Sequence, residues 1–483
     1  MRTKDLRFGL AIFGASLALL LVRFLVPRPI GMADNGDGWR LLCKLGGKQL
    51  DRPAEGFVRF SYGAGDPCTS DYVSSQTWLD WLASKAGHLF GSSAILNLLV
   101  LGVGTCVLVA VAITAAVTGL DLGRRGKVVA TVLLLLVMGD SAFFGYFAST
   151  LSEGAAFLGM LLIAGGLVLM HRDRARRYAG AVITVLGGLI GINAKSQTLL
   201  LIPLFVLAVL LVKPQGARGG ARWALPLAVL VLVGGGTFAV QSHGDPANAE
   251  YREANVYNAI FDSIVDGRHD TNADLAALGL PQSFAKYIGT GWWTPGAAKT
   301  DPLYPRYRDK ISRRNVLAYY ESHPVRVAQI LQQGGVNTLT ARPDNLGSFG
   351  ELSGQAWLSK EYRVPLFSGL AALTAPAGLF VLVPLWLLMI WAAVRAFRRR
   401  RREYGLVVLM LTFFAVGQLG LSALGEGVEG VKHQLLTLFP TVLALAFAIL
   451  SLLPRAEGPQ KPQREPEDEE PLTEKIAAVV RGG

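Results

Sequence analysis

Charged residues are scarce in this sequence: Asp, Glu, Lys and Arg make up 17% of the 483 residues, whereas hydrophobic residues make up 51%. Soluble domains carry about 25% charged residues. Several apolar runs approach the roughly 20 residues that a helix needs to cross a bilayer. The composition therefore excludes a soluble enzyme of this size and predicts an all-α polytopic membrane protein.

Motifs for nucleotide binding are also missing, since there is no Walker loop and no Gly-x-Gly-x-x-Gly after a strand. The formal net charge of +12 could indicate a nucleic-acid partner. Many of the basic residues, however, lie in short connections between apolar runs, where the positive-inside rule places them. We therefore expect membrane lipids, and no nucleic acid, as partners.

The chain has three cysteines. Cys43 and Cys68 fall in the first long polar segment, and Cys106 lies inside an apolar run. If that polar segment is outside the cell, the first two could form a disulfide, which would be stable there and not in a reducing cytosol. Two unpaired thiols are the alternative, and the sequence leaves both open.

Ten apolar runs are expected to form transmembrane helices. The first is expected to be a retained helix rather than a cleaved signal, because its candidate cleavage sites lie inside the apolar core or beyond several Arg and Pro residues. Interruptions by Gly, Pro or a charge are typical of helices that pack on one another and line a cavity. The runs are Phe8–Pro27, Ser93–Gly119, Lys127–Phe147, Thr150–Met170, Ala179–Asn193, Leu199–Val212, Trp223–Val240, Leu366–Val394, Leu406–Leu424 and Leu435–Leu453.

Basic residues alternate regularly along this series: three precede the first run, and every second connection after it is basic. The positive-inside rule then predicts a plasma-membrane protein with both termini in the cytoplasm and the other connections outside. The basic residues are Arg2, Lys4 and Arg7; Arg124, Arg125 and Lys127; Arg172, Arg174, Arg176 and Arg177; Lys213, Arg218 and Arg222; and Arg395 with Arg398 to Arg402.

Two long segments fall outside under this topology. In the first, Trp78 and Trp81 indicate an interfacial helix. The second has helical patterning broken at His323-Pro324, and a loop this long is usually functional. The expected divisions are an N-terminal transmembrane module (1–241) with the first outer loop (28–92), an outer loop region (242–365), C-terminal transmembrane helices (366–453) and a disordered cytoplasmic tail (454–483).

A polar stretch from Gly31 to Arg40 follows almost directly after the first run and carries Asp34 and Asp37. An acidic pair at that depth is costly unless it is hydrated, paired or used in chemistry. Further polar residues are expected at the outer ends of other helices, which favours one extracytoplasmic site. They are Asp140, Ser152, Glu153, Asn193, Lys195, Gln197, Glu426, Glu429, Lys432 and His433.

Each of these residues also has a structural explanation. The Asp, Asn and Gly residues of the first loop could form an ordinary turn. Glu153 could complement a helix dipole, and Lys195 could extend to lipid headgroups. His433 could be a packing histidine, and Asp140 could be a turn acid. Their joint location, rather than any single residue, favours a functional site.

Transfer from a lipid-linked donor suits this combination of groups. A carboxylate can act as general base on an acceptor hydroxyl, while Lys and His offer charge and hydrogen bonds to a phosphate leaving group. Nucleotide sugars are cytoplasmic, whereas the expected cluster faces out. A donor that is itself a membrane lipid is consistent with the lack of a nucleotide site and with the outward position of the cluster.

Short motifs carry a family resemblance over most of the chain up to Pro454. They are Asp34-Asn35-Gly36-Asp37-Gly38-Trp39-Arg40, the segment Tyr146 to Glu153, the pair Lys432-His433, and Asn255 to Phe261 with Leu278 to Pro281 after it. With these motifs the chain resembles the GT-C superfamily of integral membrane glycosyltransferases, which use polyprenyl-phosphate sugars. More narrowly, it resembles the bacterial wall-glycan hexosyltransferases of actinobacterial and related pathways.

The resemblance implies a catalytic base at Asp34 or Asp37 and a donor phosphate site. Many relatives have adjacent acidic residues in the first loop, whereas Asn35 and Gly36 intervene here. A divalent cation bound by these aspartates and Glu153 stays an open alternative. The predicted catalytic residues are Asp34, Asp37 and Glu153, and the predicted substrate-binding residues are Arg40, Lys195, Gln197, Lys432 and His433.

The sequence thus predicts an inverting glycosyltransferase. It would move a sugar, expected to be a hexose, from a polyprenyl-phosphate donor to a cell-envelope glycan, glycolipid or protein at the outer face of the membrane. One alternative is a transporter or lipid flippase for envelope precursors, although paired pseudo-symmetric halves are not found. Another is a non-catalytic envelope-assembly protein.

Overall fold

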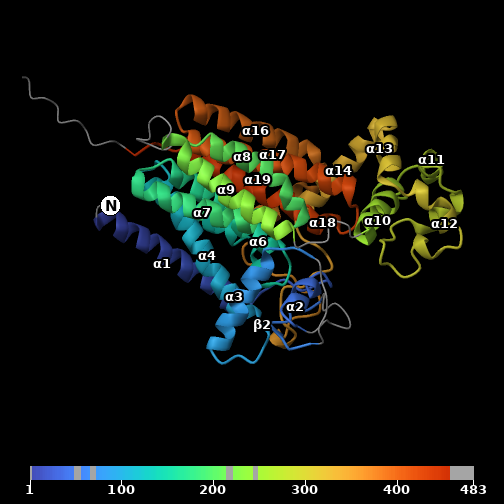
Figure 1. Cartoon of the computed structure of the whole chain (residues 1–483), viewed down its shortest axis with the longest axis horizontal. Coiled ribbons are helices and arrows are strands. Elements are labelled where there is room, and N and C mark those ends of the chain that lie inside the picture. The colour runs from blue at the N-terminus through green and yellow to red at the C-terminus, as the bar shows by residue number, and fades with distance from the viewer. Residues whose placement is uncertain (1–2, 48–55, 66–71, 214–220, 243–248, 457–483) are drawn as a thin grey trace, which may run out of the picture.

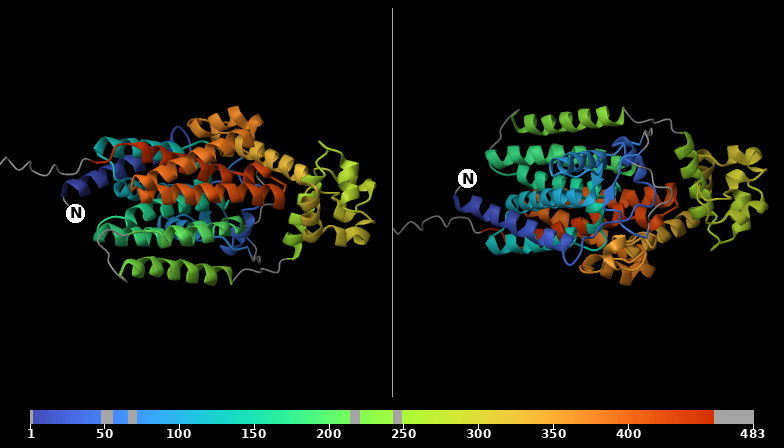
Figure 2. Two further views of the ribbon diagram at one scale, coloured as in Figure 1. Left: turned by 90° about the horizontal axis from the view of Figure 1, so that it is seen from above. Right: turned by 90° about the horizontal axis from the view of Figure 1, so that it is seen from below.

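The computed structural model describes residues 3–47, 56–65, 72–213, 221–242 and 249–456. A bundle of long helices forms most of it, and a small lobe projects from one end of the bundle (Figures 1 and 2). The predicted disordered tail lies almost entirely outside the described residues, as does Cys68.

Eight helical spans among the described residues are long and apolar enough to cross a membrane, which confirms the all-α polytopic fold. They are α1 (Thr3–Leu25), α4 (Leu98–Gly119), α6 (Glu153–Met170), α7 (Arg174–Ile192), α9 (Ala221–Gln241), α16 (Leu379–Arg398), α17 (Arg402–Gly425), and α18 (Gly430–His433) continued by α19 (Leu435–Leu452).

Two of the ten predicted transmembrane helices are shorter than expected. Helix α5 (Arg124–Met138) has 15 residues and α8 (Leu201–Leu210) has 10, so they extend about 22 and 15 Å, less than the hydrocarbon thickness. The predicted run Leu366–Val394 also divides, into α15 (Leu366–Thr374) and α16. The turn between them passes through Gly378, whose φ of +53° is unfavourable for a residue with a side chain.

Helix α6 forms the centre of the bundle, because every one of its residues is buried. A helix that is apolar on all faces after its first residue needs partners on every side. It packs most closely on α7 through glycines: a Cβ at Gly159 would lie 2.2 Å from the Cα of Gly191, and one at Gly166 would lie 2.3 Å from the hydroxyl of Thr184. Small residues thus let the two backbones meet.

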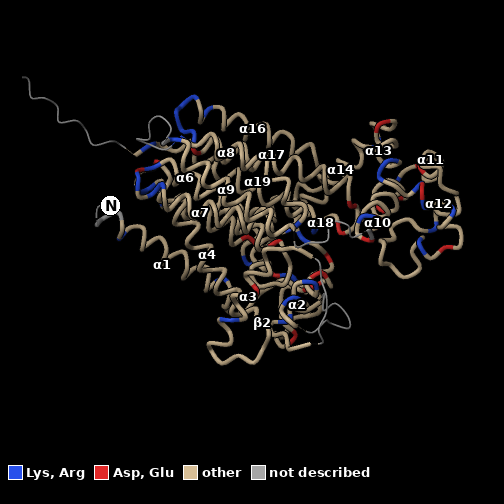
Figure 3. The backbone as a smooth tube through the Cα atoms, in the orientation of Figure 1, with Lys and Arg blue, Asp and Glu red and all other residues tan. Residues whose placement is uncertain are grey.

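The two ends of the bundle differ in charge. Lys and Arg gather at the end that holds the connections α4–α5, α6–α7 and α16–α17 (Figure 3). These connections lie close together. Asp121, between α4 and α5, forms ion pairs with Arg172, between α6 and α7, at 3.7 Å and with Arg455, after α19, at 3.5 Å. We call this the basic end, and the opposite end, with the first loop and the small lobe, the loop end.

The first loop segment carries α2 (Trp39–Lys44), α3 (Gln76–Leu89), and a two-stranded sheet of β1 (Ser61–Tyr62) and β2 (Leu96–Asn97). The helix predicted at Trp78 and Trp81 is confirmed as α3, which exposes both indoles in part. Its placement in the membrane interface stays a prediction. Cys43 in α2 is disulfide-bonded, and Cys106 is a free buried thiol.

The small lobe, residues 249–322, has a hydrophobic core of its own that is rich in aromatic residues. Tyr257, Phe261 and Phe284 are fully buried in it. The lobe joins the bundle through α14 (Pro324–Thr340), and the predicted break at His323-Pro324 separates α13 from α14. Its other elements are α10 (Ala249–Asn258), the π-helix η3 (Ala259–Ile264), α11 (Thr271–Ala277), η4 (Gln282–Tyr287), η5 (Ala298–Thr300), α12 (Tyr304–Tyr307), η6 (Arg308–Lys310) and α13 (Arg313–Ser322).

Short 3₁₀ segments complete the chain and help to shape the loop end. They are η1 (Phe144–Ala148), η2 (Ser196–Leu200), η7 (Glu351–Ser353) and η8 (Ala375–Ala377). Of these, η1 precedes α6, which begins with Glu153, and η2 contains Gln197 and leads into α8.

Candidate active site

The first loop is shaped by Asp34, which is 3% exposed. One carboxylate oxygen, Oδ1, accepts hydrogen bonds from the backbone N–H of Gly36 at 2.9 Å and of Gly38 at 2.8 Å. The other oxygen, Oδ2, is buried without a hydrogen-bond partner. Asp34 therefore fixes the turn that presents Asp37.

Close backbone contacts seat this loop on the segment before α6. A Cβ at Gly31 would lie 2.5 Å from the carbonyl oxygen of Ala148, and one at Gly38 would lie 2.0 Å from the hydroxyl of Thr150. Larger residues at either glycine would push the loop away. The first loop and the start of α6 are thereby held in register.

Asp37 pairs with a lysine almost 400 residues further along the chain. The Lys432 ammonium, only 1% exposed, lies 2.6 Å from Asp37 Oδ2 and also forms an ion pair with Glu429. Asn35 donates a hydrogen bond to the same Glu429, and Arg40 lies 3.5 Å from Asp37 Oδ1. The loop after α1 and the start of the last helix thus form one charged unit.

A second lysine completes the cluster. Lys195 Nζ lies 3.0 Å from Glu153 Oε1, at the start of α6, and 3.1 Å from His433 Nδ1. Gln197 donates to Glu426 at 2.5 Å and lies 3.3 Å from His433 Nδ1. Residues from the first loop, α6, η2 and the α17–α19 connection therefore meet at the loop end.

Aromatic rings border the cluster on one side. The Arg40 guanidinium lies 5.5 Å from the ring centroid of Tyr72 and 4.5 Å from that of Tyr251, which belongs to the small lobe. The Tyr72 hydroxyl is 3.2 Å from the Ser152 hydroxyl. Arg40 thus connects the first loop with both the bundle and the lobe, and neither tyrosine was identified from the sequence.

The carboxylates of the cluster differ in acidity. Burial raises the pKa of Asp34, against the effect of its backbone hydrogen bonds. Burial alone would also raise the pKa of Asp37, but the Lys432 ammonium, aided by Arg40, outweighs it and holds that pKa well below its usual range. Burial raises the pKa of Glu426. Asp37 is thus the more acidic of the two carboxylates in the first loop, and 38% of its side chain is exposed.

All eight predicted site residues are brought together by these contacts, but two other polar residues expected there are not. Asp140 accepts hydrogen bonds from the backbone N–H of Phe367 at 2.7 Å and Ser368 at 3.1 Å, so it caps α15. Asn193 bonds to Thr237 at 3.0 Å and thereby joins α7 to α9. The expectation that Asp140 and Asn193 belong to the site is wrong, because backbone and packing groups satisfy them first.

A second polar network was missed by the sequence reasoning. Arg23 forms an ion pair with Glu361, which also accepts a hydrogen bond from the Ser141 hydroxyl at 3.0 Å. Ser348, in the same strap of chain, accepts the backbone N–H of Gly31 at 3.1 Å. The network therefore connects α1 and the start of the first loop to the segment that contains Ser348 and Glu361. Its signal in the sequence is a charge, Arg23, inside the first apolar run.

The alternative of a divalent cation finds no ligand set in the described part of the chain, where no three His, Cys, Asp or Glu side chains are grouped to hold a metal. Asp37 and Glu153 have lysine partners instead, and Asp34 is held by backbone N–H groups. The ammonium groups of Lys195 and Lys432 lie close enough to interact, beside the partly exposed Asp37 carboxylate. Two cations with hydrogen-bonding neighbours suit an anion.

Known proteins are similar to this chain in structure or in sequence. A crystal structure of the oligosaccharyltransferase of Archaeoglobus fulgidus, tethered to an acceptor peptide with an NVT sequon, is similar with a TM-score of 0.38 and 12% identity. The match covers 92% of this chain and 48% of that enzyme, so the chain spans about half of its length. No curated protein matches. The family model of the YfdI N-terminal transmembrane domain matches residues 3–461, and this confirms the resemblance to GT-C membrane glycosyltransferases. The chain belongs to the YfdI N-terminal transmembrane domain family.

Proposed function

We propose that this protein transfers a sugar, a hexose, from a polyprenyl-phosphate donor to a hydroxyl of an envelope glycan, glycolipid or protein. The reaction takes place at the outer face of the plasma membrane, at the loop end of the bundle. The observation that carries the proposal is the pairing of Asp37 with the buried Lys432, beside Lys195 and His433. This arrangement offers a base and a phosphate site within one cluster.

Asp37 is the proposed general base, since its carboxylate is ionised and partly exposed, whereas Asp34 is buried and holds the turn. Asp37 takes the proton of the acceptor hydroxyl, and the acceptor oxygen attacks the anomeric carbon. The bond between that carbon and the phosphate oxygen breaks, and its electron pair leaves with the polyprenyl phosphate. Displacement from the opposite face inverts the anomeric configuration.

Lys195 and Lys432 stabilise the charge that develops on the departing phosphate. Glu153 is a positioning residue in this mechanism, because it contacts Lys195 and is itself only 2% exposed. His433 and Gln197 add hydrogen bonds on the same side of the cluster. Arg40, stacked between two tyrosine rings, holds the first loop near the small lobe, where the acceptor enters.

The test compares Asp37→Asn and Asp34→Asn with Asp344→Asn in membranes supplied with a radiolabelled polyprenyl-phosphate sugar. Asp37→Asn should reduce transfer about 10²- to 10⁴-fold, because it removes the base. Asp34→Asn should have a smaller effect, since an amide oxygen can still accept both backbone hydrogen bonds. Asp344 is an almost fully exposed carboxylate that pairs with Lys360, and its variant should be fully active. Full activity of both Asp37→Asn and Asp34→Asn would refute the proposal.

A further inference from the structure

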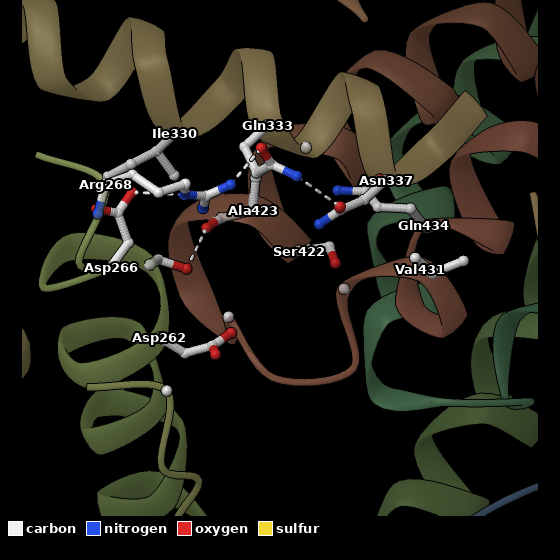
Figure 4. A pocket seen from close by; sticks show the side chains of 15 residues that line it. Asp262, Asp266, Arg268, Ile330, Gln333, Asn337, Ser422, Ala423, Val431 and Gln434 are labelled. Carbon is white, nitrogen blue, oxygen red and sulfur yellow. Dashed lines mark hydrogen bonds and ion pairs between the residues drawn. The ribbon is translucent and has the colours of Figure 1, made fainter. Parts of the chain in front are cut away.

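A cavity of about 280 Å³ lies where the small lobe meets the bundle (Figure 4). Its volume is close to the roughly 300 Å³ at which ligand pockets begin. Gly427 and Gly430 line it, and they belong to the same connection that carries Glu426 and Glu429 into the charged cluster. The cavity is therefore next to the proposed active site but has different walls.

Two polar side chains face this cavity without a partner. Ser422 of α17 is 3% exposed, and its hydroxyl has no hydrogen bond among the described residues. Asp262 of η3 faces the same space from the small lobe, and its carboxylate likewise has neither a hydrogen bond nor an ion pair in the described part of the chain. Figure 4 shows the two side chains on different walls of one opening. Asp262 is half-buried, and Ser422 is buried except where it meets the cavity. Both polar groups are therefore available to a ligand in this space.

Three further polar side chains of the cavity form a hydrogen-bonded chain along α14. Arg268 donates to Gln333 Oε1 at 2.5 Å, and Gln333 Nε2 donates to Asn337 Oδ1 at 2.9 Å. This leaves the amide N–H groups of Asn337 as donors at the cavity. Asp266 is already paired, with Arg326 at 3.0 Å and Arg268 at 3.3 Å.

The lining selects a neutral ligand with many hydroxyl groups. The lining holds two carboxylates, Asp262 and Asp266, against the one guanidinium of Arg268, and this excess of negative charge disfavours an anion. The described residues hold no set of three metal-ligating side chains. A carboxylate acceptor, amide donors and a serine hydroxyl within one cavity are complementary to the hydroxyl groups of a sugar ring, each of which both donates and accepts.

We propose that this cavity binds one sugar unit of the acceptor, a neutral hexopyranoside, and thereby makes the protein specific for a glycan or glycolipid acceptor. The inference rests on the proposed function. Asp262 accepts hydrogen bonds from the sugar hydroxyls, and Ser422 and Asn337 bond to the opposite edge of the ring. Because Gly427 and Gly430 belong to the connection that bears Glu426 and Glu429, a sugar held here lies beside the cluster in which the next unit reacts.

The connection between α17 and α18 is held in place by close contacts, so it can form a rigid side of the cavity. Gly427 has a φ of +76°, and a Cβ there would lie 2.7 Å from the carbonyl oxygen of Asn258. Glu429 has a φ of +55°, unfavourable for a residue with a side chain. Backbone of this kind persists only where its surroundings hold it, and it is concentrated at ligand sites.

The experiment measures binding of methyl hexopyranosides to the purified full-length protein by calorimetry, in a detergent without a sugar headgroup. The panel contains the glucoside, galactoside, mannoside and N-acetylglucosaminide, with inorganic phosphate and MgCl₂ as separate probes. At least one hexoside should bind the wild type. Asp262→Asn should weaken that binding about tenfold or more, because it removes a charged acceptor, and Ser422→Leu should block it by filling the cavity.

Asp309→Asn is the matched control, since Asp309 is an exposed acid of the same lobe away from the cavity, and it should bind like the wild type. Asp37→Asn should lose transfer and keep binding. The inference is overturned if no hexoside binds, if binding is insensitive to Asp262→Asn, or if only phosphate or Mg²⁺ binds. Each of these results leaves the transfer test of Asp37 intact, so the two proposals can fail separately.

Discussion

Lys432 offers the sharpest test of the electrostatic argument. Its ammonium is 1% exposed and forms ion pairs with Asp37, at 2.6 Å, and with Glu429. Methionine has a similar shape and no charge, so Lys432→Met removes the charge without opening a large cavity. Removing one partner of a fully buried pair costs about 3–5 kcal/mol, because the other charge is left buried and unpaired.

The full value does not apply here. The Asp37 side chain is 38% exposed and that of Glu429 is 26% exposed, so water can solvate both carboxylates after the substitution. We therefore expect Lys432→Met to lower the free energy of unfolding by about 1–3 kcal/mol. Transfer should fall by about 10²- to 10³-fold, the usual effect of removing a group that stabilises developing charge.

The assay is unfolding of the purified variants in detergent, together with transfer in membranes. Lys360→Met is the matched control: Lys360 also pairs with an aspartate, Asp344, at 2.6 Å, but that aspartate is 98% exposed, so stability and transfer should not change. The double variant Asp37→Asn/Lys432→Met should lose less free energy of unfolding than the sum of the losses of the two single variants, and it should remain inactive. Strictly additive effects on stability, or full transfer by Lys432→Met, would refute the reasoning.

Three further predictions concern other parts of the molecule. Burial raises the pKa of Asp80 in α3 to about 7, so the folded state favours the protonated form of this carboxyl. The free energy of unfolding should therefore fall as pH rises from about 4 to 7. Asp80→Asn should flatten this dependence when unfolding is measured across that range. Asp140→Ala should lower the free energy of unfolding by about 1 kcal/mol, because it removes the cap of α15, and should leave the KM for the donor unchanged. A large rise in that KM would place Asp140 in the site. A cysteine introduced as Asp344→Cys should react with an impermeant maleimide applied to intact cells, and labelling only after lysis would reverse the topology.

The bundle and the composition of the cluster could be predicted from the sequence because both depend on local signals. Apolar runs give the helices, and the alternation of basic connections places Asp37, Glu153 and Lys432 at one end. The alternation of basic connections does not predict the partners of Asp140. It indicates the end of the bundle at which a side chain lies, but not which neighbouring residue the side chain contacts. It also misses the break at Gly378, because the apolar run continues through it. Partners such as Asp37 with Lys432 depend on packing between distant segments, which no local pattern encodes.

The ionisation of Asp37 connects the two halves of the proposed reaction. Burial would raise its pKa, but the Lys432 ammonium holds the pKa well below the usual range, which makes Asp37 a weak base in the structure described here. A phosphate bound at Lys432 and Lys195 would neutralise the positive charge facing this carboxylate, and the pKa of Asp37 would then rise. Under the proposed mechanism the base therefore becomes effective once the donor is in place. The acceptor hydroxyl is activated only when there is a sugar to receive.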